Sequence, residues 1–298
     1  ALRSDIQKAL ALQCFINEYL YEENKFEIET LKALEQSIEL SFTNKKQPET
    51  HVLLCLASYR PLNLYNWTKL ISLPNQFQNI YKTFIRDFFT EKKLSSKIPL
   101  LAEVSDKISS EVRMQYEENP YPRWESIYLP EKKRSIGDWL SFYSPKFKNE
   151  KISEIKYPKI LVAGTGTGQQ SIGSAVVISG ASVDALDLSK SSLSYAFRKA
   201  KELGIKNIKF LQADLFETDF IKTKYDLIQC SGVLHHTSDP LEGLVKLRSK
   251  LSSHGIIQIG LYSRFARYHL NKIRNEIAKR SLGSSEKEML AFREELLV

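Results

Sequence analysis

The sequence lacks the features of a membrane-spanning, disulfide-bonded or low-complexity protein. No apolar run approaches the roughly 20 residues that a membrane helix needs, so no membrane insertion is expected. Its three cysteines, Cys14, Cys55 and Cys230, lie far apart with no Cys-x-x-Cys pair, which predicts neither a disulfide framework nor a zinc site. A reducing cytoplasm is therefore the expected location. Twelve glycines and ten prolines in 298 residues exclude a collagen-like chain.

Acidic residues are outnumbered, and the net charge is +8 with an isoelectric point near 9.1. Most of the excess lies after residue 110. A basic face there could attract nucleic acid, an acidic protein or an anionic cofactor, but a solvated lysine-rich surface is the simpler interpretation. No basic run is dense enough in aromatic residues to form a nucleic-acid groove, so no nucleic-acid partner is expected.

Strand-like patterns are missing before about residue 155, and apolar residues, Leu20 among them, recur at helical spacing from residue 4 to 42. Further helices are expected over 50–58, 65–72, 76–94 and 99–118. Residues 1–112 are therefore predicted to form an all-helical domain that recruits substrate or mediates formation of a homodimer. The start has no secretory signal. The last residues stop inside a helical pattern with no capping residue, so 266–298 is expected to be the truncated start of a C-terminal helical region.

From about residue 155 short β-rich runs alternate with helical stretches. The strands are expected at 159–163, 182–187, 207–212, 225–230 and 255–262, and the helices at about 168–179, 189–203 and 240–252. This alternation predicts an α/β fold over 155–265, with a Rossmann-like, doubly wound parallel sheet. Ligands of such sheets bind beyond the carboxyl ends of the strands.

The first strand runs into the glycine-rich turn Gly164-Thr165-Gly166-Thr167-Gly168. Glycines allow a sharp turn and a close approach of the backbone to a ligand. A dinucleotide fingerprint would have its third Gly or Ala where this chain has Gln169. About 20 residues on, Asp187 ends the second strand, where a carboxylate can bind ribose hydroxyls, or alternatively cap the next helix.

The third and fourth predicted strands also end in polar groups. Asp214 follows the third strand and could accept a hydrogen bond from an adenine amino group, with Leu215 packed near the ring. The fourth strand ends in CSGVLHHTSDP, residues 230–240. Polar loops after successive strands, in this order, form a stronger signal than any one of them.

With AGTGTG, DALDLS, QADLF, CSGVLHHTSDP and IGLYS in this order, residues 155–262 resemble the class I S-adenosylmethionine-dependent methyltransferases. The resemblance implies S-adenosylmethionine as cofactor and the following residues as its contacts: Gly164, Thr165, Gly166, Gly168, Asp187, Leu188, Asp214, Leu215, Ser231 and Gly232. Many members carry an acidic residue two places before the first glycine, where this chain has Val162.

The segment YEENPYPRW at 116–124, upstream helices and the sheet motifs resemble a bacterial subgroup more closely. Its members combine a methyltransferase domain with tetratricopeptide-like helices, and the rickettsial lysine methyltransferases that act on outer-membrane proteins are similar. The resemblance implies a lysine-bearing protein substrate, with an outer-membrane protein as a candidate.

The residues of that segment agree with such a role. Residues 113–154 are predicted to form an aromatic and basic connector that covers part of the active site. Tyr116, Tyr121 and Trp124 could line a slot for an amine, with Tyr121 near the reacting groups. Arg123 could pair with the carboxylate of the cofactor. A stiff connector that packs its aromatic rings in a crevice is the alternative.

His235 and His236 follow the fourth strand. His235 is a candidate base for the substrate amine and His236 a candidate substrate contact, although histidines here more often only shape a pocket. The remaining histidines form no cluster with them, so no metal site is predicted.

Other functions stay open at this point. One is a small-molecule methyltransferase that acts on a quinone or metabolite. Another is an NAD-dependent reductase, which Gln169 disfavours. The third is a non-catalytic scaffold, which remains possible because Val162 stands where many members have an acidic residue.

Overall fold

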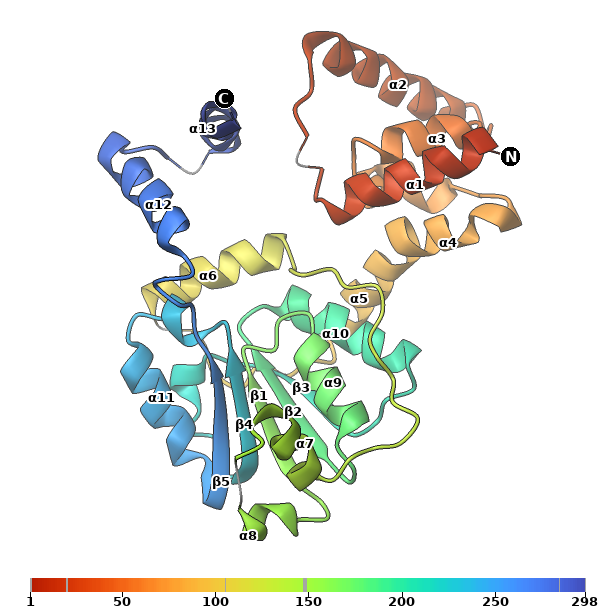
Figure 1. The fold of residues 1–298 in the computed structure, drawn as a ribbon. Helices are drawn as coiled ribbons and strands as arrows, with labels where there is room; N and C mark the ends of the chain where they lie inside the picture. The colour runs from red at the N-terminus through yellow and green to blue at the C-terminus, as the bar shows by residue number, and fades with distance from the viewer. Residues whose placement is uncertain (1, 20, 105, 147–148, 284, 298) are drawn as a thin grey trace. The chain divides into compact units, whose positions relative to one another are not determined.

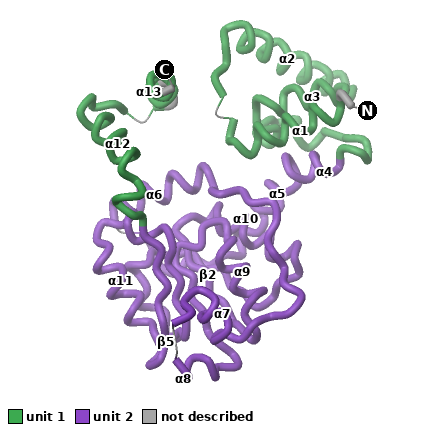
Figure 2. The backbone as a smooth tube through the Cα atoms, viewed as in Figure 1, with its two compact units in different colours: residues 1–77, 262–298 green, residues 78–261 purple. Residues whose placement is uncertain are grey.

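The structure is a computed structural model that describes residues 2–19, 21–104, 106–146, 149–283 and 285–297. Ala1 and Val298, the outer bounds of the predicted domains, and Leu20, one of the apolar positions predicted in the N-terminal helices, lie outside the described residues. The chain divides into two compact units (Figure 2). One comprises residues 1–77 and 262–298, and the other residues 78–261.

The first unit is helical, as its apolar periodicity predicted. It contains α1 (Leu2–Ile16), α2 (Lys25–Thr43), α3 (Thr50–Ala57), 3-10 turns at Leu62–Leu64, Asn66–Leu70 and Asn75–Phe77, and the C-terminal helices α12 (Tyr268–Arg280) and α13 (Glu286–Leu297). Helix α2 begins with a capping box, in which Asn24 accepts from the N–H of Glu27 and Glu27 accepts from the N–H of Asn24. The predicted helix at 65–72 is a shorter 3-10 turn.

The second unit begins with helices that precede the sheet. They are α4 (Gln78–Tyr81), a π-helical turn (Lys82–Arg86), α5 (Asp87–Ser95), α6 (Lys107–Glu118), α7 (Ile136–Tyr143) and α8 (Glu150–Ser153). The sequence pattern placed a helix over 99–118, but α6 begins only at Lys107, where Asp106 caps it. Nearer the start of that stretch, Leu100 instead forms a parallel bridge with Gln212, and Leu101 donates to the carbonyl of Gln212 at 2.9 Å.

The sheet of the second unit has five parallel strands in the order β3-β2-β1-β4-β5. The strands are β1 (Lys159–Ala163), β2 (Ser182–Asp187), β3 (Ile208–Gln212), β4 (Tyr225–Ser231) and β5 (Leu251–Gly260). Helices α9 (Gln169–Val177), α10 (Lys190–Glu202) and α11 (Pro240–Ser249) connect them. The predicted Rossmann-like, doubly wound fold preceded by helices is confirmed.

Both faces of the sheet are buried because the strands alternate their apolar side chains between two layers. Ile160 and Val162 of β1 pack in a cluster that includes side chains of α7, α8 and α9. Leu161 and Ala163 point the other way, into a cluster with Leu247 of α11. Figure 1 shows α11 on one side of the sheet and α9 and α10 on the other.

The chain adds its later strands to the sheet on the opposite side of β1 from its earlier ones. The chain runs outward from β1 to β2 and β3, then returns to the other side of β1 as β4. The loops after β1 and β4 therefore diverge, which leaves a crevice at the carboxyl ends of these strands.

Among the helices of the described residues, none is both long and apolar enough to cross a membrane.

Candidate functional site

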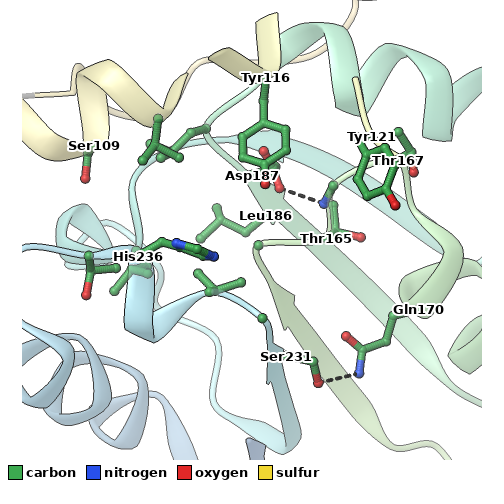
Figure 3. A pocket seen from close by; sticks show the side chains of 18 of the residues that line it. Ser109, Tyr116, Tyr121, Thr165, Thr167, Gln170, Leu186, Asp187, Ser231 and His236 are labelled. Carbon is green, nitrogen blue, oxygen red and sulfur yellow. Dashed lines mark hydrogen bonds between the residues drawn. The ribbon is translucent and has the colours of Figure 1, made fainter. Parts of the chain in front are cut away.

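A cavity of about 380 Å³ opens at the carboxyl ends of the strands (Figure 3). Its size is that of small-molecule and cofactor sites. The loops after β1, β2, β3 and β4 form one side and helix α6 with the segment after it forms the other. The lining residues are Ser109, Val112, Tyr116, Tyr121, Pro122, Gly164, Thr165, Gly166, Thr167, Gln169, Gln170, Leu186, Asp187, Leu188, Ala213, Asp214, Leu215, Ser231, Gly232, Val233, His236 and Thr237.

The glycine-rich turn after β1 is folded tightly against the end of β2. The N–H groups of Gly164 and Thr165 both donate to the carbonyl of Leu186, at 2.8 and 3.0 Å. Gly164 has a φ of +70°, and a Cβ there would lie 2.2 Å from a methyl group of Val233. Gly166 is also left-handed, with a φ of +53°, and lies at the cavity wall. The turn therefore needs glycine for both conformation and space.

Asp187 lies at the centre of the site and braces the turn. Its carboxylate accepts from the N–H of Gly166 at 2.6 Å and from the N–H of Ser189 at 2.9 Å. Burial raises the pKa of Asp187 to about 6, and the nearby charge of Glu117 acts in the same direction, while backbone hydrogen bonds oppose the shift. Asp187 therefore both holds the turn and presents a partly desolvated carboxylate to the cavity.

Asp214 lies at the cavity wall beyond the end of β3. Its Oδ1 accepts from the N–H of Phe216 at 3.0 Å. Its Oδ2 is buried and has no hydrogen-bond partner among the described residues. Because a buried polar atom without a partner is costly, this oxygen fits a ligand that brings a hydrogen-bond donor.

The end of β4 and the residues after it form a further part of the cavity wall. Ser231 Oγ accepts from Gln170 Nε2 at 3.3 Å, so this pair joins the end of β4 to the first turn of α9 (Figure 3). His236 lines the cavity, whereas His235 does not. The two rings lie side by side with centroids 4.2 Å apart and planes tilted by 52°. The structure therefore presents the second histidine, not the predicted base, to the cavity.

The YEENPYPRW segment divides between the cavity and the core. Tyr116 and Tyr121 line the cavity, Tyr121 with 69% of its surface exposed. Trp124 is buried against Tyr195 and lies outside the lining. Arg123 also lies outside it, and its charge acts on Glu91 of α5 and on Tyr195. The segment thus lines the cavity with two of its aromatic rings and buries the third.

Most of the predicted site residues are brought together. The cavity wall includes Tyr116, Tyr121, Gly164, Thr165, Gly166, Asp187, Leu188, Asp214, Leu215, Ser231, Gly232 and His236. Four lie outside it, namely Arg123, Trp124, Gly168 and His235. Gly168 instead packs against α10, where a Cβ would lie 2.4 Å from the Cβ of Ala196.

Sequence reasoning missed the wall formed by α6. Ser109, Val112 and Tyr116 are spaced by three and four residues, so they share one helical face, and that face lines the cavity. This spacing was visible in the sequence, but nothing in it indicated where the helix lies. Gln170 was missed because a glutamine in the first turn of a helix carries no distinctive pattern.

The charge of the cavity differs from that of the chain. Among the described residues that line it, two are carboxylates, Asp187 and Asp214, and none is Lys or Arg. The chain as a whole carries +8. The cavity is thus suited to a cationic or neutral ligand.

Comparisons of sequence agree with this geometry. Residues 157–290 match the profile of a family described as a methyltransferase domain. This region resembles the class I methyltransferases. The match runs from just before β1 past the end of α12, so it includes the four loops that carry the predicted cofactor contacts.

Two curated bacterial relatives are described only as uncharacterized proteins. One is from Synechococcus sp., 29% identical over 190 residues, which are 61% of this chain and 44% of the relative. The other, RP789 of Rickettsia prowazekii, is 29% identical over 120 residues, 40% of this chain and 20% of the relative. The chain thus spans less than half the length of the curated relatives it matches.

Solved structures with partial similarity include two methyltransferase structures. One is PKMT2 from Rickettsia typhi in complex with AdoHcy, with 20% identity, a TM-score of 0.38, and coverage of 46% of this chain and 27% of that one. The other is the magnesium protoporphyrin IX methyltransferase ChlM from Synechocystis with bound SAM, with 24% identity, a TM-score of 0.37, and coverage of 51% and 75%.

Proposed function

We propose that the protein is an S-adenosylmethionine-dependent methyltransferase. The observation that carries the proposal is that Asp187 and Asp214, at the ends of successive strands, both line one cavity. The Oδ2 of Asp214 is buried and has no hydrogen-bond partner among the described residues. The methyltransferase-domain match over residues 157–290 supports it independently. A nucleoside with vicinal ribose hydroxyls and an amino group brings donors to both carboxylates.

The residues present fit this cofactor. Asp187 would hold the ribose, Asp214 would accept from the adenine amino group, and the turn at Gly164–Gly166 would lie under the methionine part. When bound, the cofactor supplies an electrophilic methyl group on a sulfonium. The absence of Lys and Arg from the described lining avoids repulsion of that positive charge. With no acidic residue at Val162, the backbone of the turn is left to meet the ammonium group.

The main catalytic task of this chain would be alignment, because the leaving group is already activated. Tyr121, Ser231 and His236 lie at the cavity wall, where they can orient an acceptor. In this proposal His236, which lines the cavity, would take a proton from the acceptor through a ring nitrogen. His235, beside it and outside the lining, can orient that ring.

For the acceptor, we propose a lysine side chain of a protein. The support is the resemblance of the YEENPYPRW segment to lysine methyltransferases, and the two tyrosines of that segment in a cavity without Lys or Arg among its described lining. In this proposal residues 1–112 recruit the protein substrate. A quinone or metabolite acceptor is the alternative, since the same cavity also accommodates a neutral ring.

One sequence feature favours the NAD-dependent reductase alternative, but in the structure it lies away from the cavity. Tyr195 and Lys199 have the Tyr-x-x-x-Lys spacing of an NAD-dependent reductase dyad. However, Tyr195 is buried, its hydroxyl donates to the carbonyl of Trp124, and neither residue lines the cavity. The dyad is therefore not placed to reach a substrate there.

Calorimetric titration with S-adenosylhomocysteine, and with NADH in parallel, tests the cofactor. We expect S-adenosylhomocysteine to bind and NADH not to bind, and binding of NADH alone would overturn the proposal. A screen with labelled S-adenosylmethionine on bacterial membrane proteins and on a quinone set then tests the acceptor. Label in acid-stable methyl-lysine supports the lysine proposal, whereas label only in small molecules contradicts it.

A further inference from the structure

Glu117, near the end of α6, caps the first turn of α10. Its Oε1 accepts from the N–H of Lys190 at 2.7 Å. Its Oε2 accepts from the N–H of Ser191 at 2.9 Å and from the Ser191 hydroxyl at 2.6 Å. A carboxylate at a helix N-terminus binds otherwise unpaired N–H groups and interacts favourably with the helix dipole.

Hydrogen bonds near this cap lead to residues that line the cavity, among them Tyr116 and Asp187. The carbonyl of Tyr116 accepts from the hydroxyl of Ser189 at 2.9 Å. The N–H of Ser189 donates to Asp187, whose other oxygen accepts from Gly166. A continuous set of hydrogen bonds thus connects the end of α6 to the ribose-site carboxylate and to the glycine turn.

The other end of α6 is also held in the second unit. Asp106 caps α6 through the N–H of Ser109, and its side chain also bonds with Ser238 in the loop after β4; these contacts lower the pKa of Asp106. Helix α6 is therefore anchored at both ends, near the loop after β4 and at α10. Between the anchors, Ser109, Val112 and Tyr116 line the cavity (Figure 3).

We propose that Glu117 is a positioning residue, which holds the α6 wall against the cavity by capping α10 and so sets the affinity for the cofactor. Glu117 does not itself line the cavity. Besides the effect of its charge on Asp187, it acts through Tyr116. The inference rests on the proposed methyltransferase function for its ligand, but the anchoring of α6 can be tested without any ligand.

The substitution Glu117→Gln is suited to the test because it preserves the shape of the side chain. A carboxylate accepts on both oxygens, as the three contacts to Lys190 and Ser191 require. A glutamine amide accepts only on its oxygen and would turn an NH₂ group toward a backbone N–H. One side of the cap is then lost and the N–H there is left unpaired.

Ser135→Ala is the matched control. Ser135 caps α7 by accepting from the N–H of Asp138 at 3.0 Å, and it does not line the cavity. Both variants lose part of a helix cap in the same unit. Any effect specific to α6 or to the cofactor therefore separates from a general loss of stability.

The first measurement is amide hydrogen exchange of the ligand-free protein. In Glu117→Gln the amides of residues 107–118 should exchange at least about fivefold faster than in the parent, with no such change in Ser135→Ala. Unchanged exchange of α6 would overturn the anchoring role. This outcome does not depend on the cofactor, so it also stands if the methyltransferase proposal fails.

The second measurement is titration with S-adenosylhomocysteine in a double-mutant cycle with Tyr116→Ala. Glu117→Gln alone should weaken binding about tenfold, consistent with loss of charge-assisted hydrogen bonds. In the Tyr116→Ala background the further loss should be under about twofold, because the two residues act together. Additive losses, or unchanged affinity in the single variant, would overturn the proposal. If the parent shows no binding, the proposed function fails and the exchange result decides the anchoring.

Discussion

The indole Nε1 of Trp124 donates a hydrogen bond to the carbonyl of Thr167 at 2.9 Å, which joins the aromatic segment to the glycine turn. The Thr167 hydroxyl donates in return to the carbonyl of Pro122 at 2.6 Å. These reciprocal bonds fix residues 122–124 beside the turn. The tryptophan thus acts on the cavity through the backbone, without lining it.

Trp124→Phe should therefore weaken cofactor binding while the fold is retained. The ring stays buried, but Thr167 loses its donor, and we expect the dissociation constant for S-adenosylhomocysteine to rise about fivefold. Trp139→Phe is the control, because Trp139 is also buried but lies in α7 outside the cavity lining. Equal affinities of the two variants in calorimetry would contradict this role.

Binding of the cofactor should depend on pH through Asp187. Its pKa is raised by burial to about 6, so the carboxylate loses its charge as the pH falls below 6. Because ribose hydroxyls bond best to the ionised form, the affinity should fall about tenfold between pH 7.5 and pH 5. Titrations at several pH values check this, and Asp187→Asn should remove that dependence. A flat profile in the parent would contradict it.

The raised pKa of Asp187 has the opposite effect on the stability of the ligand-free protein. A carboxyl group whose folded pKa is above its usual value of 3.8 contributes stability at low pH, and the contribution is lost as the pH rises through about 6. Asp187 therefore costs stability at the pH where it binds best, which is typical of functional residues.

The sheet was predictable because each strand carries its own signal. β1 was expected and found at 159–163, since a short apolar run followed by glycines has few other interpretations. The carboxyl ends of parallel strands then meet at one edge, so the convergence of Asp187 and Asp214 followed from topology. β5 departs most from the expectation, since it was predicted at 255–262 and runs over Leu251–Gly260.

The role of the aromatic segment could not be predicted in the same way. Tyr121 and Trp124 are three residues apart in one motif, yet one lines the cavity and the other is buried against Tyr195. Sequence shows that both are aromatic, but the direction of each side chain depends on tertiary contacts of an irregular segment. His235 and His236 differ for the same reason.

Gly168 should tolerate alanine much less well than Gly204. Both have a positive φ, +87° and +68°, but a Cβ at Gly168 meets Ala196 at 2.4 Å, whereas one at Gly204 meets nothing within 4 Å. We expect Gly204→Ala to cost about 1 kcal/mol from backbone strain alone, and Gly168→Ala about 2–4 kcal/mol with the clash added. Urea unfolding of both variants measures the difference, and equal losses would show that α10 yields.

Tyr121→Ala should lower turnover without weakening cofactor binding. The side chain lines the cavity with 69% of its surface exposed, so its removal should leave the fold intact. If it orients the acceptor, kcat should fall about 10- to 100-fold while the affinity for S-adenosylhomocysteine changes less than about twofold. Tyr157→Ala, exposed and outside the cavity lining, is the control. Equal loss of both quantities would make Tyr121 part of the cofactor site.

Asp214→Asn should change which purine the cavity prefers. Oδ1 already accepts from the N–H of Phe216, so an asparagine keeps that bond with its oxygen and places its NH₂ where the partnerless Oδ2 lies. An adenine amino group would then meet a donor, while the 6-oxo group of a hypoxanthine would meet a suitable partner. We expect the parent to bind S-adenosylhomocysteine more tightly than S-inosylhomocysteine, and the variant to reverse that preference, with a combined change of at least about tenfold. Competition calorimetry with the two compounds measures the ratio directly. A ratio that the substitution leaves unchanged would mean that the base lies elsewhere in the cavity, because no other orientation of this side chain satisfies Phe216 and spares the adenine.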